Sequence, residues 1–497
     1  MTATAPPDAG DSRLRRTMNT PQIVFLVIAA AAPLAAMVGT VPLAFALGDG
    51  PGVPAMFAFS GVTLLCFSVG YAAMSRRIVN AGGFYTYIGS GLGKVPAVAG
   101  GLIAVVAYNA VTVGLVGAFA YFAQLIAASH GWSIAWEWWA AGGIALMAVL
   151  GYRQIDISAR VLAVLMCGEV LILAVLDVAV LIRKGGAAVP TTSFSPHTIF
   201  GGGLGVSVMF AFISFIGFES AALYGEESRN PRRSVPLATY LSVLIIAIFY
   251  ALTSWIAVGA VGAGSVQRVA TQQLGNLFFT LSGSYLNQAG TTVMQVLLCT
   301  SLFAGMLALH NASNRYMFVL GRDRVLPRWF DTVHGRHGAP HRASLVQTSL
   351  TVVMVAIFAT AGLNPYLNLA TAMLALGTLG IVVLQAAAAL SVLGYFRKDP
   401  ERHWWRTGLA PLLGVAGLVT ATVLVVRNFA VIAGTSNVIV TSLPWLIVAC
   451  AVGGAGYALW LRATRPARYA LLAQVEARPA EDVPVPEHAP ERVQEAR

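Results

Sequence analysis

A lone carboxylate and a glycine lie together inside one of the most apolar stretches of the chain. Residues 210–236 read FAFISFIGFESAALYGEESRNPRRSVP, in which Gly217 and Glu219 precede a charged, basic end. A membrane-spanning helix normally avoids both a break in its backbone hydrogen bonds and an ionisable side chain, which costs about 2.5 to 3.5 kcal/mol at mid-bilayer. The combination indicates a ligand or ion site. Glu219 is there either as a protonatable or hydrogen-bonding support, or only to satisfy loose backbone groups.

A second isolated carboxylate, Glu169, lies within the apolar run VLAVLMCGEVLILAVL, with no basic residue within two helical turns. A carboxylate inside a membrane can take up and release a proton, so Glu169 is a candidate proton site. The alternative is a neutral carboxylic acid that is hydrogen-bonded to a neighbouring helix. For Asp177 we expect a position at the membrane interface, and for His310 a packed, hydrogen-bonded ring.

The composition places these residues in a membrane. Of the 497 residues 57% are hydrophobic and only 10% are charged, and the mean hydropathy is +0.74. These values are typical of an integral membrane protein and exclude a soluble globular domain. Because about 20 mostly apolar residues cross a bilayer, the sequence predicts twelve spans, at residues 21–47, 54–75, 95–128, 136–151, 157–182, 199–224, 236–262, 291–314, 343–362, 367–396, 408–426 and 438–462.

The basic residues are distributed asymmetrically between these spans. With the N-terminus placed in the cytoplasm, 27 of the 31 lysines and arginines fall in cytoplasmic segments, in agreement with the positive-inside rule. The net charge of +11 is therefore a topology signal, and we expect a lipid bilayer and no nucleic acid as partner. Residues 1–19 and 464–497 are rich in Pro, Ala and charge, and we predict two disordered cytoplasmic tails there.

Two spans contain helix-breaking residues near their middle. The first reads AAAAPLAAMVGTVP over residues 29–42, and the sixth contains Gly217. Because the two spans are an odd number of spans apart, they run in opposite directions across the bilayer. Interrupted helices at corresponding positions of two inverted halves are typical of secondary transporters, in which freed N–H groups and carbonyls face a common site. Two ordinary kinks are the alternative.

Several short motifs lie in order along the chain, after span two, within and after span six, and after span eight. They are Asn80-Ala81-Gly82-Gly83-Phe84-Tyr85, then Phe215-Ile216-Gly217-Phe218-Glu219, then Glu226-Glu227-Ser228-Arg229-Asn230-Pro231 with Val235-Pro236, and finally Asn314-Arg315-Tyr316 with Gly321-Arg322-Asp323 and Leu326-Pro327. With them the chain resembles the amino acid–polyamine–organocation (APC) superfamily of permeases over roughly residues 20–465. The resemblance implies an all-α polytopic membrane protein with twelve transmembrane helices in a five-plus-five inverted-repeat (LeuT-like) fold, with discontinuous helices 1 and 6. The repeats would be residues 20–184 and 196–396, followed by two further spans over 407–463.

The resemblance also implies a site for a small zwitterion between spans one and six, closed by spans three and eight. The break of span one would fall near Ala35-Ala36-Met37, where many relatives carry a Gly-Ser-Gly type run, so only backbone amides could donate there. The break of span six would fall on residues 214–217. The substrate-binding candidates are Ala35, Ala36, Met37, Gly39, Tyr108, Val111, Phe212, Ser214, Phe215, Ile216 and Gly217. The coupling or gating candidates are Glu219, Glu169 and Ser301, with Glu169 and Ser301 near each other in the fold.

These observations favour a permease that imports amino acids across the plasma membrane by proton symport and alternating access. Sodium is the alternative coupling ion, since Thr300 and Ser301 could supply part of its oxygen ligands. We expect no other cofactor and no metal. The apolar pocket candidates favour neutral or hydrophobic amino acids, and Ile213 replaces the tryptophan that arginine–agmatine exchangers carry.

Other functions are left open or disfavoured. An amino acid or amine exchanger and a polyamine or small-amine permease remain possible, and the oligomeric state is open. An intramembrane enzyme is disfavoured, because the ionisable residues of the spans are scattered and form no set of nucleophile, base and metal ligand at one depth.

Overall fold

The computed structural model describes residues 18–78, 82–153, 159–224, 228–334, 340–400, 402–434 and 437–473. Within these ranges the chain forms helices and no β-strand. The long helices are α3 (Val53–Ser75), α5 (Lys94–Ser129), α6 (Trp136–Arg153), α7 (Ala159–Lys184), α10 (Pro231–Val261), α13 (Gln288–Arg322), α14 (His341–Thr360), α15 (Thr371–Tyr395), α16 (Ala410–Ile432) and α18 (Pro444–Thr464).

Shorter helices complete the spans or connect them. The broken spans consist of α1 (Thr20–Ala31) with α2 (Pro33–Leu47), and α9 (Leu204–Ser214) with the 3₁₀ helix η4 (Phe218–Tyr224). The others are η1 (Gly50–Gly52), α4 (Gly83–Leu92), η2 (Gly185–Ala188), η3 (Thr191–Phe194), α8 (Pro196–Ile199), α11 (Val266–Gln273), η5 (Leu274–Asn276), α12 (Leu277–Tyr285), η6 (Arg328–Phe330), η7 (Pro365–Ala370), η8 (Phe396–Lys398), η9 (Trp405–Leu409), α17 (Val438–Thr441) and α19 (Pro466–Ala470).

The described residues include eleven helical segments long and apolar enough to cross a membrane. The predicted span that is missing from this set is 136–151, which corresponds to α6. This helix contains three tryptophans, Glu137 and Arg153 within 18 residues, and these polar and amphipathic side chains lower its hydropathy. A polytopic membrane protein is thus confirmed, while the count of twelve spans stays a prediction.

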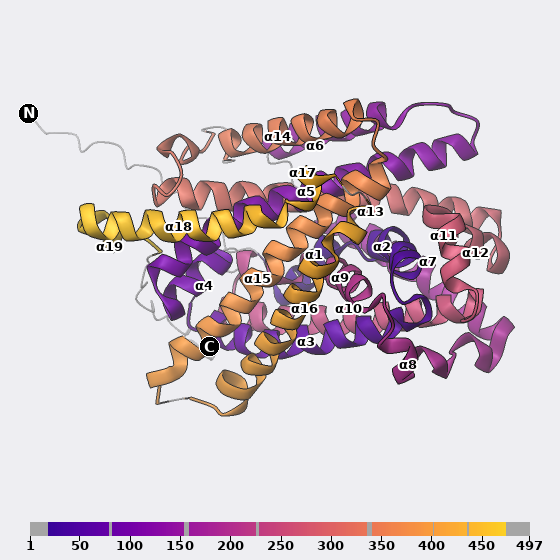
Figure 1. Ribbon diagram of the computed structural model, residues 1–497, viewed down its shortest axis with the longest axis horizontal. Coiled ribbons are helices and arrows are strands. Elements are labelled where there is room, and N and C mark those ends of the chain that lie inside the picture. The colour runs from indigo at the N-terminus through magenta and orange to yellow at the C-terminus, as the bar shows by residue number, and fades with distance from the viewer. Residues whose placement is uncertain are drawn as a thin grey trace, which may run out of the picture.

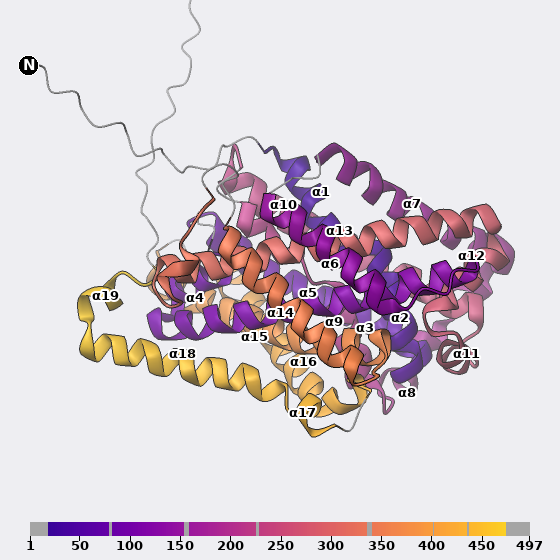
Figure 2. The ribbon, with the colours of Figure 1, turned by 90° about the horizontal axis from the view of Figure 1, so that it is seen from above.

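The two broken spans lie in the middle of the molecule. In an apolar 18-residue window of each span, buried residues make up 83% for Thr20–Leu47 and 94% for Leu204–Ala221, against 22% for Pro444–Thr464. Figures 1 and 2 show α2 and α9 enclosed by longer helices, whereas α18 runs along the edge. Helices α5 and α15 pack against each other beside them, and α3 packs along α10. A span surrounded by protein can leave its helical path, because its freed polar groups need not face lipid.

The first break occurs earlier than predicted. It lies at Ala32, which adopts a left-handed conformation (φ 46°, ψ 70°), and Ala35, Ala36 and Met37 are already helical within α2. Pro33 explains the shift. A proline disfavours the helical conformation of the residue before it and is well suited to the first position of a new helix. Pro33 therefore ends α1 and starts α2 at the same place.

The two ends of the molecule are covered by short elements. Helices α4 and α19 lie at one end, and α11 and α12 at the other (Figures 1 and 2). Residues 465–473, which belong to the predicted disordered C-terminal tail, are instead packed against the protein. Lys94 Nζ donates a hydrogen bond to the Tyr469 carbonyl at 3.1 Å, and the Ala473 N–H donates to Asp323 Oδ2 at 3.0 Å. In the predicted N-terminal tail, Met18 pairs with Ser228 and Asn19 caps α1. Residues 1–17 and 474–497 lie outside the described residues.

Asp49 joins the end of α2 to the start of α9. Its backbone N–H donates to Ser207 Oγ at 2.8 Å, and its Oδ1 accepts from the Gly203 N–H at 2.8 Å. Its Oδ2 is buried without a hydrogen-bond partner among the described residues. Partial burial raises the pKa of Asp49, and the hydrogen bond from Gly203 opposes that shift.

We predict that Asp49→Ala lowers the free energy of unfolding by about 1 to 3 kcal/mol, because the Gly203 N–H loses its acceptor. Asp49→Asn keeps an acceptor and removes the buried charge, so it should change stability by less than about 1 kcal/mol. Since the folded state holds the proton of Asp49 more tightly than the unfolded state, wild type should gain stability relative to Asp49→Asn as the pH falls toward the ordinary aspartate range. Thermal unfolding in detergent between pH 4 and 8 measures both effects. An Asn variant less stable than the Ala variant would contradict this account.

Candidate functional site

The first break is capped by side chains from two other helices. Glu169 Oε2, on α7, accepts hydrogen bonds from Ser301 Oγ of α13 at 2.6 Å and from the Leu34 N–H at 3.3 Å. The Ala35 N–H donates to Ser301 Oγ at 3.4 Å. Ala32, the residue before α2, has no side chain that could cap the helix. Glu169 therefore occupies the position at a helix N-terminus where an anion is most favourable.

The second break has the same arrangement. Gly217 adopts φ +110° between α9 and η4, and its N–H donates to Glu219 Oε2 at 3.1 Å. The other oxygen, Oε1, accepts a hydrogen bond from the Tyr108 hydroxyl at 2.8 Å. Glu169 and Glu219 are 5% and 2% exposed. At each break a buried carboxylate thus accepts a backbone N–H group that the break leaves free. Glu169 reaches the first break from α7, and Glu219 lies on the second broken span itself.

The two breaks also contact each other. A Cβ atom on Gly217 would lie only 2.8 Å from the carbonyl carbon and oxygen of Ala30, so no larger residue fits there without movement. The Tyr250 hydroxyl of α10 donates to the Ala31 carbonyl at 3.3 Å. The C-terminal end of α1 is therefore held between the second break and α10.

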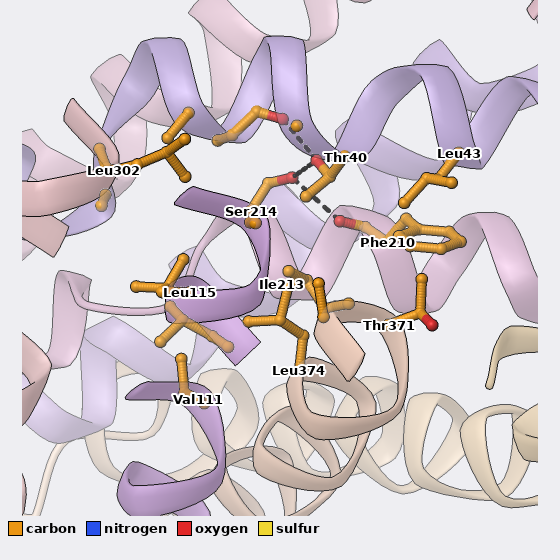
Figure 3. A pocket seen from close by; sticks show the side chains of 18 of the residues that line it. Thr40, Leu43, Val111, Leu115, Phe210, Ile213, Ser214, Leu302, Thr371 and Leu374 are labelled. Carbon is orange, nitrogen blue, oxygen red and sulfur yellow. Dashed lines mark hydrogen bonds between the residues drawn. The ribbon is translucent and has the colours of Figure 1, made fainter. Parts of the chain in front are cut away.

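A cavity lies between the broken spans and helices α5, α13 and α15. It holds about 50 Å³ of space that the centre of a water molecule can reach, and about 10 to 15 Å³ on this scale admits one water. Thr40 Oγ1 and Ser214 Oγ share a hydrogen bond of 2.7 Å at its wall. Figure 3 shows these two side chains pointing toward each other, with Leu302, Leu115 and Leu374 also among the lining residues. The lining contains no charged side chain; it consists of Ala30, Ala31, Ala32, Ala35, Ala36, Gly39, Thr40, Leu43, Val111, Leu115, Ala118, Phe210, Ile213, Ser214, Ile216, Leu302, Leu309, Tyr366, Ala370, Thr371 and Leu374.

Aromatic side chains pack on both sides of this cavity along the spans. Toward the end that carries α4 and α19, the rings of Tyr108 and Tyr316 stack with centroids 5.1 Å apart, and Tyr71 and Tyr87 pack beyond them at 4.9 Å. We call these four residues the near aromatic cluster. Toward the end that carries α11 and α12, the far aromatic cluster consists of Tyr121, Phe122, Phe279 and Tyr366, in which Tyr121 and Tyr366 stack at 4.5 Å. The Tyr366 hydroxyl also donates to the Gly39 carbonyl at 2.8 Å.

The structure brings part of the predicted substrate-binding set to the cavity. Its lining includes Ala35, Ala36, Gly39, Val111, Ser214 and Ile216, but not Met37, Tyr108, Phe212, Phe215 or Gly217. Helical geometry explains most of the difference. On α2 the cavity is lined at residues 35, 36, 39, 40 and 43, which form one face with a period of 3.6, and Met37 points elsewhere. Phe215 instead packs on the ring of Tyr250 at 5.8 Å.

Tyr108 and the coupling candidates lie next to the cavity rather than in its wall. The Tyr108 hydroxyl is bonded to Glu219, one helical turn from Val111, which does line the cavity. The predicted proximity of Glu169 and Ser301 is present. Thr300 Oγ1 is bonded to the Leu297 carbonyl of its own helix at 2.9 Å.

The sequence prediction did not include several of the residues that line the cavity. Thr40 and Leu43 could have been found by extending the face of Ala36 and Gly39 by helical periodicity. Tyr366 belongs to η7, and Thr371 and Leu374 belong to α15. No charged residue distinguishes these lining positions from ordinary core positions.

The remaining buried titratable groups are held by hydrogen bonds. His310 is bonded through Nδ1 to Gln347 and through Nε2 to Ser344 Oγ at 2.9 Å, as expected for a packed histidine. Asp177 is buried, at 7% exposure, and accepts a hydrogen bond from Thr253 Oγ1 of α10 at 2.7 Å. Asp177 thus joins α7 to α10, and its expected position at the level of the membrane interface stays a prediction. Glu226, in the motif after span six, lies outside the described residues.

We predict that Gly217→Ala lowers the free energy of unfolding by about 1 to 3 kcal/mol, because alanine is strained at this backbone conformation and its Cβ meets Ala30. Transport should fall with it, since the two breaks can no longer approach each other. Thermal unfolding in detergent and uptake in proteoliposomes measure the two effects.

The matched control is Gly142→Ala on the exposed part of α6, where an added Cβ meets no atom within 4 Å. This substitution should leave stability unchanged or raise it by about 0.5 to 1 kcal/mol through helix propensity. Equal stability of Gly217→Ala and Gly142→Ala would show that the close contact between the breaks is unimportant.

Comparisons with known proteins agree with this geometry. The amino acid permease family matches residues 18–455. An uncharacterized transporter of Mycobacterium tuberculosis is 28% identical over 382 residues, covering 76% of this chain and 79% of the relative. The branched-chain amino acid permease of Bacillus subtilis is 24% identical over 388 residues (75% and 80%), and the low-affinity putrescine importer of Escherichia coli is 24% identical over 405 residues (80% and 84%). With its two broken central spans, the chain has the predicted LeuT-like fold and belongs to the amino acid permease family of the APC superfamily.

Proposed function

We propose that this transporter imports neutral, predominantly apolar amino acids across the plasma membrane by proton symport. The observation that carries the proposal is the uncharged cavity between two helix breaks, each of which holds a buried carboxylate. It supports a substrate whose own charges cancel and whose side chain is apolar. It offers no counter-ion to a permanently charged side chain.

Backbone groups at the breaks supply the recognition of the zwitterion. The carbonyl end of α1, at Ala30 and Ala31, lines the cavity and carries the negative end of the helix dipole, which suits an ammonium group. The N-terminal turn of α2, at Ala35 and Ala36, also lines it and carries the positive end of a helix dipole, which suits a carboxylate. A substrate carboxylate would take over the Ala35 N–H from Ser301 Oγ. Leucine, isoleucine, valine or alanine side chains would then lie among the aliphatic residues of α5, α13 and α15.

Glu169 couples the proton to the substrate through electrostatics. Its carboxylate caps α2 at the Leu34 N–H, close to where the substrate carboxylate would bind. Two negative charges at one helix end repel each other, and a proton on Glu169 removes the repulsion. Proton and substrate therefore favour each other's binding, and the coupling is reciprocal. One proton moving inward across about 100 mV contributes roughly 2.3 kcal/mol, equivalent to a concentration ratio of about fifty.

Alternating access would open one aromatic cluster at a time. We place the near aromatic cluster on the cytoplasmic side, because the lysine- and arginine-rich connections lie at that end, and both termini are then cytoplasmic. Movement of the repeats 20–184 and 196–396 relative to each other would break either the Tyr108–Glu219 contact or the Tyr366–Gly39 contact. Through its hydrogen bonds to Tyr108 and to the Gly217 N–H, Glu219 would link the conformation of the second break to that of the near aromatic cluster.

Three alternatives differ from this proposal, and one of them has a specific observation behind it. The relative from Escherichia coli is named as a putrescine importer, so an amine substrate remains the second candidate, with Glu219 next to the cavity as a possible counter-ion. An exchanger would use the same cavity without net proton movement. Sodium coupling would use oxygens near Ser301 in place of the proton on Glu169. We expect no enzymatic activity.

We predict that Glu169→Gln abolishes accumulation driven by a pH gradient while retaining substrate exchange, because glutamine resembles the protonated carboxyl group but cannot release a proton. Uptake of radiolabelled leucine into proteoliposomes, with an inward proton gradient and then with equal pH, measures the first property. Counterflow between preloaded and external leucine measures the second.

Glu137→Gln on α6 is the matched control, since Glu137 is exposed and α6 contains neither of the two helix breaks. It should accumulate leucine as wild type does. Full pH-dependent accumulation by Glu169→Gln would remove the proton role from this residue. Accumulation driven by sodium alone would replace the proton with sodium.

The substrate class is tested by competition. Leucine, isoleucine, valine and alanine should inhibit radiolabelled leucine uptake at least about tenfold more strongly than arginine, glutamate or putrescine, because burying an uncompensated charge in the apolar cavity costs several kcal/mol. Inhibition strongest with putrescine would favour the amine permease instead.

A further inference from the structure

A second pocket, unrelated to the transport cavity, opens where α3 ends and α10 begins. It has a volume of about 530 Å³ and is lined by Arg76, Arg232, Arg233, Leu237 and Tyr240. We call it the arginine pocket. Its three guanidinium groups are exposed, and the first turn of α10 adds the positive end of a long helix dipole. The neighbouring Arg77 is engaged elsewhere, with Asp399 at 3.6 Å.

The arginine pocket lies at the level where the apolar spans end. Arg76 directly follows Ser75, the last residue of α3, and Arg232 and Arg233 lie in the first turn of α10. Both helices are membrane-spanning candidates. The pocket is therefore at the depth of lipid headgroups rather than in the water beyond them. Trp404 is exposed in the nearby connection to η9, which packs on α3, and exposed tryptophans are typical of this level.

An apolar stripe leads away from the pocket along α10. Its side chains are exposed and follow each other on one face of the helix: Leu237, Leu241, Leu244, Ile245, Ile248 and Leu252. In a membrane-spanning helix such a face contacts acyl chains. Leu237 belongs to both the stripe and the pocket wall. A ligand with an anionic head and apolar tails would match both parts at once, whereas soluble phosphate would use only the arginines.

We propose that the arginine pocket binds the phosphate headgroup of an anionic phospholipid, with its acyl chains along the apolar stripe of α10. A guanidinium group can donate two parallel hydrogen bonds to the oxygens of one phosphate group. Basic pockets between membrane helices are suited to anionic headgroups. The bound lipid would hold the end of α3 against the start of α10. The inference does not depend on the substrate or on the coupling ion.

The test uses the full-length protein in detergent, freed of native lipid and mixed with phosphatidylglycerol or with phosphatidylcholine. Native mass spectrometry counts the lipids that remain bound. The pocket variant carries Arg76→Gln, Arg232→Gln and Arg233→Gln. The control variant carries Arg328→Gln, Arg397→Gln and Arg462→Gln, which removes equal charge from exposed arginines outside the pocket. Thermal unfolding without added lipid verifies that the variants are folded.

Wild type and the control variant should retain phosphatidylglycerol in preference to phosphatidylcholine, and the pocket variant should bind phosphatidylglycerol on the order of 100-fold more weakly. Equal binding of the two lipids by wild type would overturn the proposal, and this comparison requires no variant. Equal loss in both variants would also overturn it, because binding would then follow net charge alone. Displacement of the lipid by millimolar inorganic phosphate would assign the pocket to a soluble anion.

Discussion

Backbone hydrogen bonds left open in the interior of a membrane protein are the constraint on which this structure depends. A break in a helix exposes N–H groups and carbonyls that lipid cannot satisfy. Here each break is resolved in the same way, by a buried carboxylate that accepts an N–H group that the break leaves free. Glu169 does this for α2 and Glu219 for the segment that begins at Gly217. The acids are thus part of the architecture as well as candidates for the mechanism.

This arrangement explains why the surroundings of the breaks are made of small residues. Gly217 approaches the Ala30 carbonyl closely, and the alanines around Ala32 leave space for the cavity. Because the carboxylates lie behind the breaks, the cavity wall itself remains uncharged. A change in the protonation of Glu169 would therefore act on the helix end that faces the substrate without placing a charge in the binding space.

Much of this could be read from the sequence, and the limits have physical causes. The two carboxylates, Gly217 and the broken spans were identified because charges and helix breakers are rare inside a membrane. The predicted location of the first break is wrong by about one helical turn. The break lies at Ala32, because Pro33 disfavours the helical conformation of the residue before it. Tyr366, Thr371 and Leu374 were missed because an apolar span surrounded by protein presents similar residues on every face. The hydrogen bonds from Thr253 to Asp177 and from Ser301 to Glu169 depend on which helices become neighbours. No local sequence pattern specifies those neighbours.

Proton uptake on substrate binding is the most direct test of the link between the cap of α2 and transport. In weakly buffered detergent solution near neutral pH, a pH-indicator dye reports protons taken up when leucine is added. The account predicts uptake of up to one proton per bound leucine by wild type, and none by Glu169→Gln, although that variant still binds leucine. Leucine binding to wild type without proton uptake, or the same uptake by both proteins, would contradict it.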